Sequence, residues 1–590
     1  MTLRLKSIEN KLIAFKNSYL FPAIVDVCVE RYSFIDFFTD IFAGIKIFSL
    51  LFPILISLSI VCGVSALTGT LSGTIAIVYT SLLGNAKYQI STISFPICVL
   101  TAEIITKYQY KGLFITSFLV CLILYTFGKL RIGEILKYTS DSFLSAIYVY
   151  VAIAILISQL QYILGIGTNP IFNDIYANII TLINNINNVT VYNTYLTLFF
   201  IGFLLLLRFI FNRYLTFFCY IILCIVITIL LKLNIVPALG YINFKSIGQD
   251  TFNYLNSYNI FSLSYTLPSK LILANIVIYA FAIALVIASQ VSTCINIGSS
   301  ISNHNKVNTN ADLISIGIAN LLSVSFGGLF ISHDAEMSIQ NIQYKTKSVV
   351  SMLSTVSLLF CVWIIRDDIF ANIPMYAISA ILIVLSLSII RQTYFKNYVS
   401  KNNEKYSFWT TLIIALYFGF VPAVFVGFVL SLFIFCHRMI KINEPSVYTN
   451  KNHDKSVQEF ISNKYGYLNN KKVYKPIFDK VEVIRLDNVL SLNLLNKTKQ
   501  LLLSCTKHAE FIIVYFQNIP FLDGEALRIL KTFVKTASKS GYKVILCGTN
   551  GLLFEILQKQ AKESNVRNAF GYIIPNFQDA INKILQWAKK

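Results

Sequence analysis

Long apolar stretches separated by polar connections fill the first 437 residues of the chain. A helix that crosses the hydrocarbon core of a bilayer, about 30 Å thick, needs roughly 20 mostly apolar residues. Stretches that reach or approach this length lie at residues 41–63, 67–83, 112–130, 143–165, 195–210, 214–231, 271–292, 313–327, 349–365, 373–390, 409–420 and 421–437. Each stretch predicts a membrane-spanning helix, and together they predict a transmembrane transport domain over residues 41–437.

Two apolar pieces, at residues 94–106 and 335–344, are too short or too polar to cross a membrane alone. With them the domain has about fourteen segments, and the two pieces are the third segment of each set of seven. Interrupted helices at matching positions indicate an α-helical polytopic fold with a 7+7 inverted repeat and a binding site at the midplane. Because a half-helix N-terminus carries unsatisfied N–H groups and partial positive charge, a facing pair would attract an anion. The alternative is that both pieces are poor spans or re-entrant structure.

Basic residues in the connections indicate the orientation, since cytoplasmic loops are enriched in Lys and Arg. Alternate connections carry Lys129, Arg131, Lys137, Arg208, Arg213, Lys306, Lys345, Lys347, Arg391, Lys396, Lys401 and Lys405. The connection at residues 167–191, on the opposite side, has no Lys or Arg. The pattern predicts a multi-pass protein of the plasma (inner) membrane, with both termini cytoplasmic and residues 1–40 as a cytoplasmic N-terminal segment.

The long apolar stretches end at residue 437, and the chain beyond it has a different pattern. Residues 438–470 are rich in Asn, Lys and Ser and predict a linker. Stretches rich in β-branched and aromatic residues predict strands at 481–489, 510–516 and 542–548. Helical spacing of apolar residues predicts helices at 492–505, 525–541 and 552–563. This alternation predicts a small cytoplasmic α/β domain over residues 471–590.

Composition agrees with a membrane protein and excludes other classes. Of the 590 residues, 56% are hydrophobic and only 13% charged, against roughly 25% charged in an average soluble chain. A soluble enzyme, a fibrous protein and a disordered chain are therefore excluded. The net charge of +21 lies largely on predicted inner loops and the tail, and we expect no nucleic-acid partner. The eleven cysteines have neither disulfide nor metal spacing, and no metal or other cofactor is expected.

Several short motifs occur in a fixed order. The first span contains Asp40, Ala43, Gly44 and Pro53, in the pattern Asp-x-x-Ala-Gly followed by a proline. Residues 82–91 precede the third segment, residues 309–321 enter the ninth span, and a Phe-Gly-Gly-Leu run at 326–329 precedes the tenth segment. In order and spacing, this set resembles the SulP family of anion transporters with a C-terminal STAS domain. The strand–loop–helix pattern around Asp523 resembles the STAS fold, although Gly524 replaces the serine that is phosphorylated in regulatory STAS proteins.

The resemblance implies a substrate pocket between the two half-helices, in a core domain that moves past a gate domain like an elevator. Carried over position by position, the pocket residues are Phe52, Pro53, Ile54, Thr92, Ile93, Ser94, Gln290, Ser332 and His333. The resemblance also implies a homodimer in the lipid bilayer, with a small inorganic anion as substrate.

The sequence departs from the family pattern at several of these positions. The Gly-Pro usual at the third-segment tip is Thr92-Ile93, and Ile54 stands where a Gln is common. Gln290 replaces the usual carboxylate of the eighth span, so it cannot exchange a proton at neutral pH. At the tenth segment, Phe330 replaces a proline and Met337 replaces a frequent basic residue.

The tip of the tenth segment is unusually acidic, with Asp334 and Glu336 next to His333. In one interpretation, the acidic side chains cap the half-helix and compensate its dipole. In the other, they bind a coupling ion or carry a proton, in place of the missing carboxylate. Both interpretations remain open at this point.

These observations predict a secondary active transporter, not an enzyme, that moves sulfate or bicarbonate by an elevator-type mechanism coupled to H⁺ or Na⁺. The alternatives within transport are a dicarboxylate transporter or an anion exchanger. A nucleobase carrier shares the membrane architecture, but the STAS-like tail argues against it. From a different class, the chain could be a membrane sensor or scaffold that signals through its tail.

Overall fold

The structure of the chain is a computed structural model, which describes residues 32–84, 88–136, 141–166, 175–189, 191–211, 213–232, 270–302, 308–365, 375–391, 404–442, 481–487, 510–517, 524–548 and 572–588. The chain divides into two compact units, Met1–Phe435 and Cys436–Lys590. Several parts of the chain lie outside the described residues, among them the predicted helices at 492–505 and 552–563, the connection at 233–269, and Asp523.

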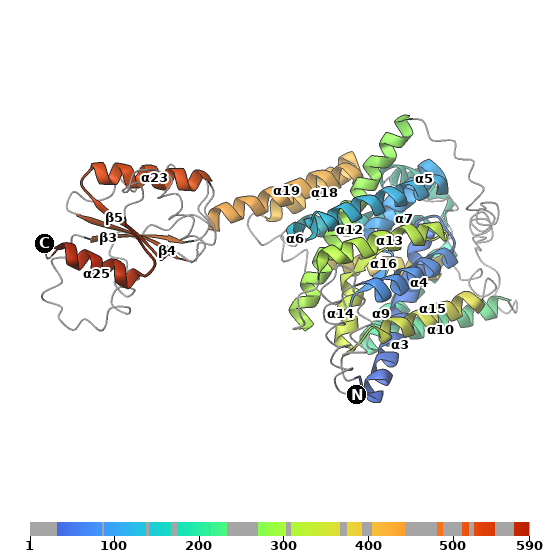
Figure 1. The fold of residues 1–590 in the computed structure, drawn as a ribbon. Helices are drawn as coiled ribbons and strands as arrows, with labels where there is room; N and C mark the ends of the chain where they lie inside the picture. The colour runs from blue at the N-terminus through green and yellow to red at the C-terminus, as the bar shows by residue number, and fades with distance from the viewer. Residues whose placement is uncertain are drawn as a thin grey trace. The chain divides into compact units, whose positions relative to one another are not determined.

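The first unit is a bundle of helices, coloured blue to orange in Figure 1. Its first-half helices are α3 (Phe34–Val61), α4 (Ala66–Leu83), α5 (Phe95–Lys129), α6 (Ile132–Leu136), α7 (Asp141–Ile163), α8 (Ile175–Asn184), α9 (Val191–Ile210) and α10 (Arg213–Lys232). Its second-half helices are α12 (Lys270–Ser302), α13 (Thr309–Ser325), α14 (Ala335–Gln343), α15 (Val350–Ile365), α16 (Met375–Arg391), α18 (Glu404–Phe418) and α19 (Phe420–Ile442). Helix α3 therefore begins before the predicted boundary at residue 41, and α19 continues past the predicted boundary at residue 437.

Two regions can be compared closely with the predicted segments, namely α5 and the connection at 167–191. The separate segments predicted at 94–106 and 112–130 are joined as α5, whose helical backbone is broken at Gln109, with a φ of 57°. This angle lies in the left-handed region, which interrupts a right-handed helix, so α5 consists of two helical pieces. The predicted connection at 167–191 contains α8 and the short 3₁₀ turn η1 (Ile186–Asn188). α8 has 10 residues, which is too few to cross a membrane.

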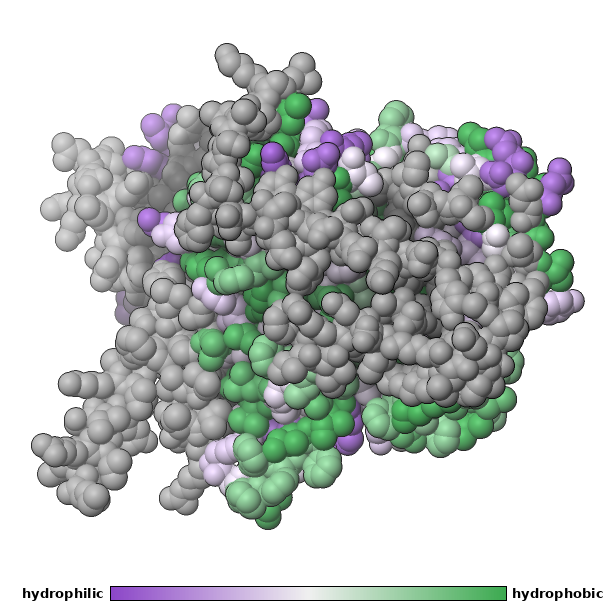
Figure 2. All heavy atoms as spheres, turned by 90° about the vertical axis from the view of Figure 1, so that its right-hand side faces the viewer, coloured by the Kyte–Doolittle hydropathy of each residue, from purple (hydrophilic) through white to green (hydrophobic). Residues whose placement is uncertain are grey.

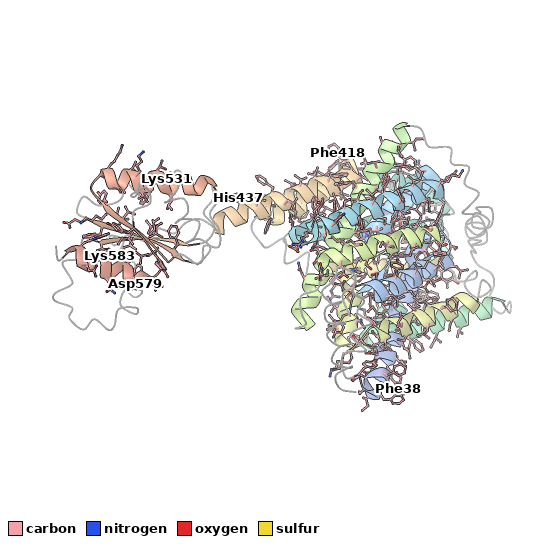
Figure 3. The ribbon with its side chains drawn as sticks, in the orientation of Figure 1. Phe38, Phe418, His437, Lys531, Asp579 and Lys583 are labelled. Carbon is pink, nitrogen blue, oxygen red and sulfur yellow. The ribbon has the colours of Figure 1, made fainter. Side chains whose placement is uncertain are left out.

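The surface of the first unit is apolar, as expected of helices in contact with lipid. Five described helices have a stretch long and apolar enough to cross a membrane, within α3, α5, α7, α12 and α19. Figure 2 shows hydrophobic residues, in green, gathered on the described part of one face. Phe38 and Phe418 in Figure 3 are 46% and 74% exposed, which suits side chains that contact lipid rather than water.

The helix packing pairs the two halves of the unit. The closest packing partners include α5 with α13, α4 with α15, α7 with α16, α7 with α18, and α9 with α16. A short antiparallel ladder joins β1 (Ile90–Thr92), before α5, to β2 (Ser332–Asp334), before α14. Each half therefore contributes one strand followed by one helix to the centre of the bundle.

The second unit contains a four-stranded parallel sheet in the order β3 (Val481–Asp487), β4 (Phe511–Gln517), β5 (Lys543–Cys547) and β6 (Tyr572–Ile574). Helices α23 (Gly524–Lys539) and α25 (Phe577–Ala588) pack on it, and Figure 1 draws them on opposite sides of the strands. Alternate side chains of a strand point to opposite faces. Accordingly Ile513 and Ile545 join the cluster with Phe577 and Ile584 of α25, and the neighbouring Ile512 and Val544 are buried too. Parallel strands covered by helices confirm the α/β alternation predicted at 481–489, 510–516 and 542–548.

Candidate functional site

The β1–β2 ladder brings together two tips that are far apart in the sequence. Ile90 pairs with Asp334, Ser91 with His333 and Thr92 with Ser332. Because the strands are antiparallel, α5 begins beyond one end of the ladder and α14 begins beyond the other. The predicted residues from segments three and ten therefore form one site between two helix N-termini.

Side chains on the ladder fall into two sets, since facing residues of an antiparallel pair point to the same side. On one side the Ser91 hydroxyl lies 2.6 Å from Nδ1 of His333. Thr92 and Ser332 share the other side, and both are buried, with 1% and 0% exposure. Within the described residues, neither hydroxyl has a hydrogen-bond partner, and neither does Nε2 of His333. Buried polar atoms are nearly always paired, so the Thr92 and Ser332 hydroxyls on one side and Nε2 of His333 on the other could each bind a ligand or water.

Gln290 connects three helices beside this ladder. The Ser94 hydroxyl donates to Gln290 Oε1 at 3.1 Å, and Gln290 Nε2 donates to the hydroxyl of Tyr148 at 2.9 Å. The amide thus joins α12 to the start of α5 and to α7. Tyr148 was absent from the sequence prediction, because nothing distinguishes it from other tyrosines inside an apolar stretch.

The two helix N-termini differ in their capping. Asp334 is the N-cap of α14, and its Oδ1 accepts the N–H of Met337 at 2.9 Å. Asp334 therefore caps the helix, as the first interpretation of the acidic tip predicted. The N-cap of α5 is Ser94, whose side chain makes no capping hydrogen bond and whose first turn has no acidic residue. The partial positive charge is therefore offset by carboxylates at α14 and left free at α5.

The predicted residues of the first span lie in an apolar region. Phe52 and Pro53 line a cavity of about 40 Å³ together with Tyr220 and Cys224 of α10 and Ala377 of α16. Ile54 is buried and is not among its lining residues. No residue of β1 or β2 lines this cavity.

Ile93 also has a packing role here. Its side chain is 1% exposed and belongs to the main hydrophobic cluster of the unit. Across the described part of the chain, no group of three or more His, Cys, Asp or Glu residues is placed to hold a metal ion.

Comparisons with known proteins identify the family and the fold. The model of the Sulfate permease family matches residues 37–414. A putative sulfate transporter, YvdB of Bacillus subtilis (strain 168), is 21% identical over 550 residues, covering 90% of this chain and 95% of the relative. Solved structures share the fold as well, among them the following three.

The structure of SLC26A9 matches with a TM-score of 0.66 and 16% identity, covering 99% of this chain and 95% of the other. Murine Slc26a9, described as an anion transporter in the inward-facing state, matches with a TM-score of 0.67 and 14% identity, covering 93% and 91%. The transmembrane domain of a cyanobacterium bicarbonate transporter, BicA, matches with a TM-score of 0.54 and 19% identity, covering 68% and 98%.

Proposed function

We propose, from the premise that this chain belongs to the sulfate permease family of anion transporters, that it is a secondary active transporter of a small monovalent anion. The observation that carries the proposal is the pairing of Thr92 with Ser332 between the N-termini of α5 and α14. Helix N-termini bind anions through free N–H groups and the helix dipole. Two buried hydroxyls without partners supply further donors at the same place.

The electrostatics of the site favour bicarbonate over sulfate. Asp334 and Glu336 add negative charge at the start of α14, and Met337 supplies no compensating cation. Repulsion by a carboxylate grows with the charge on the substrate, so a divalent anion is penalised more than a monovalent one. The same argument weighs against a dicarboxylate. Exchange of one anion for another at this site is the alternative to coupled uptake.

The packing supports an inverted repeat with elevator-type alternating access. Among the described helices, each half has seven segments when the short helices α6 and α8 are left out and the two pieces of α5 are counted separately. With segments matched in order, the packing of α5 with α13 corresponds to that of α4 with α15. In the same way, α7 with α18 corresponds to α9 with α16. In this proposal α3–α5 and α12–α15 form the moving core, and the other helices form the gate.

Coupling is proposed to involve H⁺ or Na⁺ at Asp334 and Glu336, since ionisable groups inside a membrane domain commonly serve ion pathways.

We propose that the second unit is a cytoplasmic STAS domain, on the strength of its parallel sheet with helices on both faces. The protein is proposed to function as a homodimer in the plasma (inner) membrane. Deleting the second unit should leave measurable flux, whereas a sensor would show none even when intact.

The test is flux into proteoliposomes that contain the full chain. Labelled bicarbonate, sulfate, a dicarboxylate and a nucleobase are compared at two pH values. We expect bicarbonate to move fastest, and the double variant Thr92→Val/Ser332→Ala to lose most of this flux. The matched control is Ser386→Ala on α16, which also removes a buried hydroxyl without a partner but lies away from the ladder. Faster flux of sulfate or of the nucleobase, or equal loss in the control, would contradict the proposal.

A further inference from the structure

Two cysteine thiols that are far apart in the sequence lie against each other inside the first unit. The sulfur atoms of Cys62 and Cys98 are 3.0 Å apart, about 1 Å more than the S–S bond of a disulfide at about 2.05 Å. Cys62 is the C-cap of α3, and Cys98 lies in the first turn of α5. The spacing of cysteines in the sequence indicated no disulfide, because this contact depends on how the two helices pack.

Further contacts fix the positions of both thiols. The Cys98 thiol donates to the Leu58 carbonyl oxygen at 3.2 Å, and the Cys62 thiol donates to the Cys98 carbonyl oxygen at 3.4 Å. Both side chains are buried, with 1% and 0% exposure. The residue after Cys62 is Gly63, in the left-handed region with a φ of 76° and with open space where a Cβ would lie. Bond formation requires the two sulfur atoms to approach by about 1 Å.

We propose that Cys62 and Cys98 form a reversible disulfide when the protein meets a small hydroperoxide. Hydrogen peroxide transfers one oxygen atom to a thiol, which becomes a sulfenic acid, and the other oxygen leaves as water. The second thiol attacks the sulfenic sulfur, forms the S–S bond and releases a second molecule of water. One molecule of hydrogen peroxide thus accepts the two electrons of both thiols. Thiol–disulfide exchange with two molecules of a small thiol restores the original state.

The bond would act on the start of α5. The N–H of Cys98 donates to the carbonyl oxygen of Ser94 at 2.9 Å, so the two residues share the first turn. The Ser94 side chain in turn donates to Gln290 at 3.1 Å. Pulling Cys98 toward Cys62 shifts this turn and with it the free helix N-terminus. Oxidation therefore lowers the rate of transport, and reduction restores it.

The test uses the full chain in proteoliposomes, treated with hydrogen peroxide and then with an alkylating agent that blocks the remaining thiols. Mass spectrometry of proteolytic fragments reports whether a Cys62–Cys98 peptide forms, and flux is measured before and after dithiothreitol. The variants Cys62→Ala and Cys98→Ala each remove one partner. Cys121→Ala is the matched control, because it removes a thiol from α5 beyond the break at Gln109.

We expect the linked peptide in the wild type and in the control, together with a loss of flux that dithiothreitol reverses. Neither cysteine variant should form the peptide or respond to peroxide. Absence of the peptide in the wild type overturns the proposal, and so does a peptide that forms without changing the flux. The peptide is measured independently of transport. In a chain that moved no anion the proposed function would fail, and the presence or absence of the peptide would still decide whether the disulfide forms.

Discussion

The hydroxyl of Ser94 donates a hydrogen bond of 3.1 Å to the side-chain oxygen of Gln290, on a helix that follows it by almost two hundred residues. Ser94 opens α5, and Gln290 also donates to Tyr148 on α7. Both ends of the amide are occupied, so Gln290 is a neutral link between helices. A residue at this position that carries charge would change both the link and the site.

Replacing Gln290 by Glu should make transport depend on pH. The new carboxyl group can take up and release a proton, which the amide cannot, and an ionisable group inside a membrane domain commonly takes part in proton movement. When ionised it repels the anion, so flux in proteoliposomes should rise as the pH falls. Gln290→Met, which removes the amide without adding charge, is the control and should show no new pH dependence.

Removing the negative charge at the start of α14 should improve the binding of divalent anions. Asp334→Asn retains a good N-cap residue but loses the carboxylate, whose interaction with a helix terminus is worth about 0.3–1 kcal/mol. Competition of sulfate against bicarbonate flux should strengthen accordingly. If Asp334 or Glu336 carries the coupling proton, Asp334→Asn or Glu336→Gln should also abolish the effect of a proton gradient. An unchanged response to the gradient in both variants would assign them a capping and electrostatic role alone.

Tyr32 should make the protein sensitive to alkaline pH. Its hydroxyl donates to Asp40 at 2.7 Å, and Asp40 also accepts the N–H groups of Lys347 and Ser348 at 2.8 and 3.1 Å. Burial, with a contribution from Asp40, raises the pKa of Tyr32 to about 12, against about 10 in an unfolded chain. The folded state thus holds this proton more tightly.

The protonated Tyr32 hydroxyl makes its full contribution to the stability of the fold below about pH 10. This contribution is lost as the pH rises to about 12. Thermal unfolding in detergent should show this loss for the wild type, and Tyr32→Phe should remove the part due to this residue. A curve for Tyr32→Phe that falls as steeply as the wild type over this range would contradict the assignment.

Gly44 should tolerate no side chain, because α3 and α15 are in contact there. A Cβ at Gly44 would lie 2.5 Å from the carbonyl oxygen of Ser351 and would overlap the side chain of Ser354. Overpacking of this kind typically costs about 1–3 kcal/mol, so Gly44→Ala should lower the thermal stability. Gly202→Ala on α9 is the control, since a Cβ there meets nothing within 4 Å and its unfolding temperature should stay near that of the wild type.

Lys46 connects α3 to two aromatic rings on other elements. Its ammonium lies 5.3 Å from the ring centroid of Tyr214, which opens α10, and 5.2 Å from that of Tyr344, which follows α14. A cation–π contact is worth about 0.5–2 kcal/mol. Lys46→Met keeps most of the apolar stem but loses the charge, and we expect faster amide hydrogen exchange at the start of α10. Lys405→Met, whose contact is with the adjacent Tyr406 at 5.5 Å, should leave that exchange unchanged.

The sequence by itself determined most of the helices of this protein and the composition of their surfaces. Helices such as α4 and α10 begin and end within a few residues of the predicted stretches, because the length and hydropathy of a spanning helix are properties of a local stretch. The two short segments and the acidic cap at Asp334 are also visible in local sequence, since capping depends on a residue and its next few neighbours.

Only the tertiary structure decided which of the predicted site residues meet. The pairing of Thr92 with Ser332, the contact of Gln290 with Tyr148 and the approach of Cys62 to Cys98 depend on how whole helices pack. Phe52 and Pro53, expected in the pocket, line an apolar cavity together with Tyr220 of α10 and Ala377 of α16. Hydropathy carries no information about such contacts, because an apolar helix is compatible with the lipid bilayer whichever other helices it packs against. Packing and the pairing of buried polar groups select one of them.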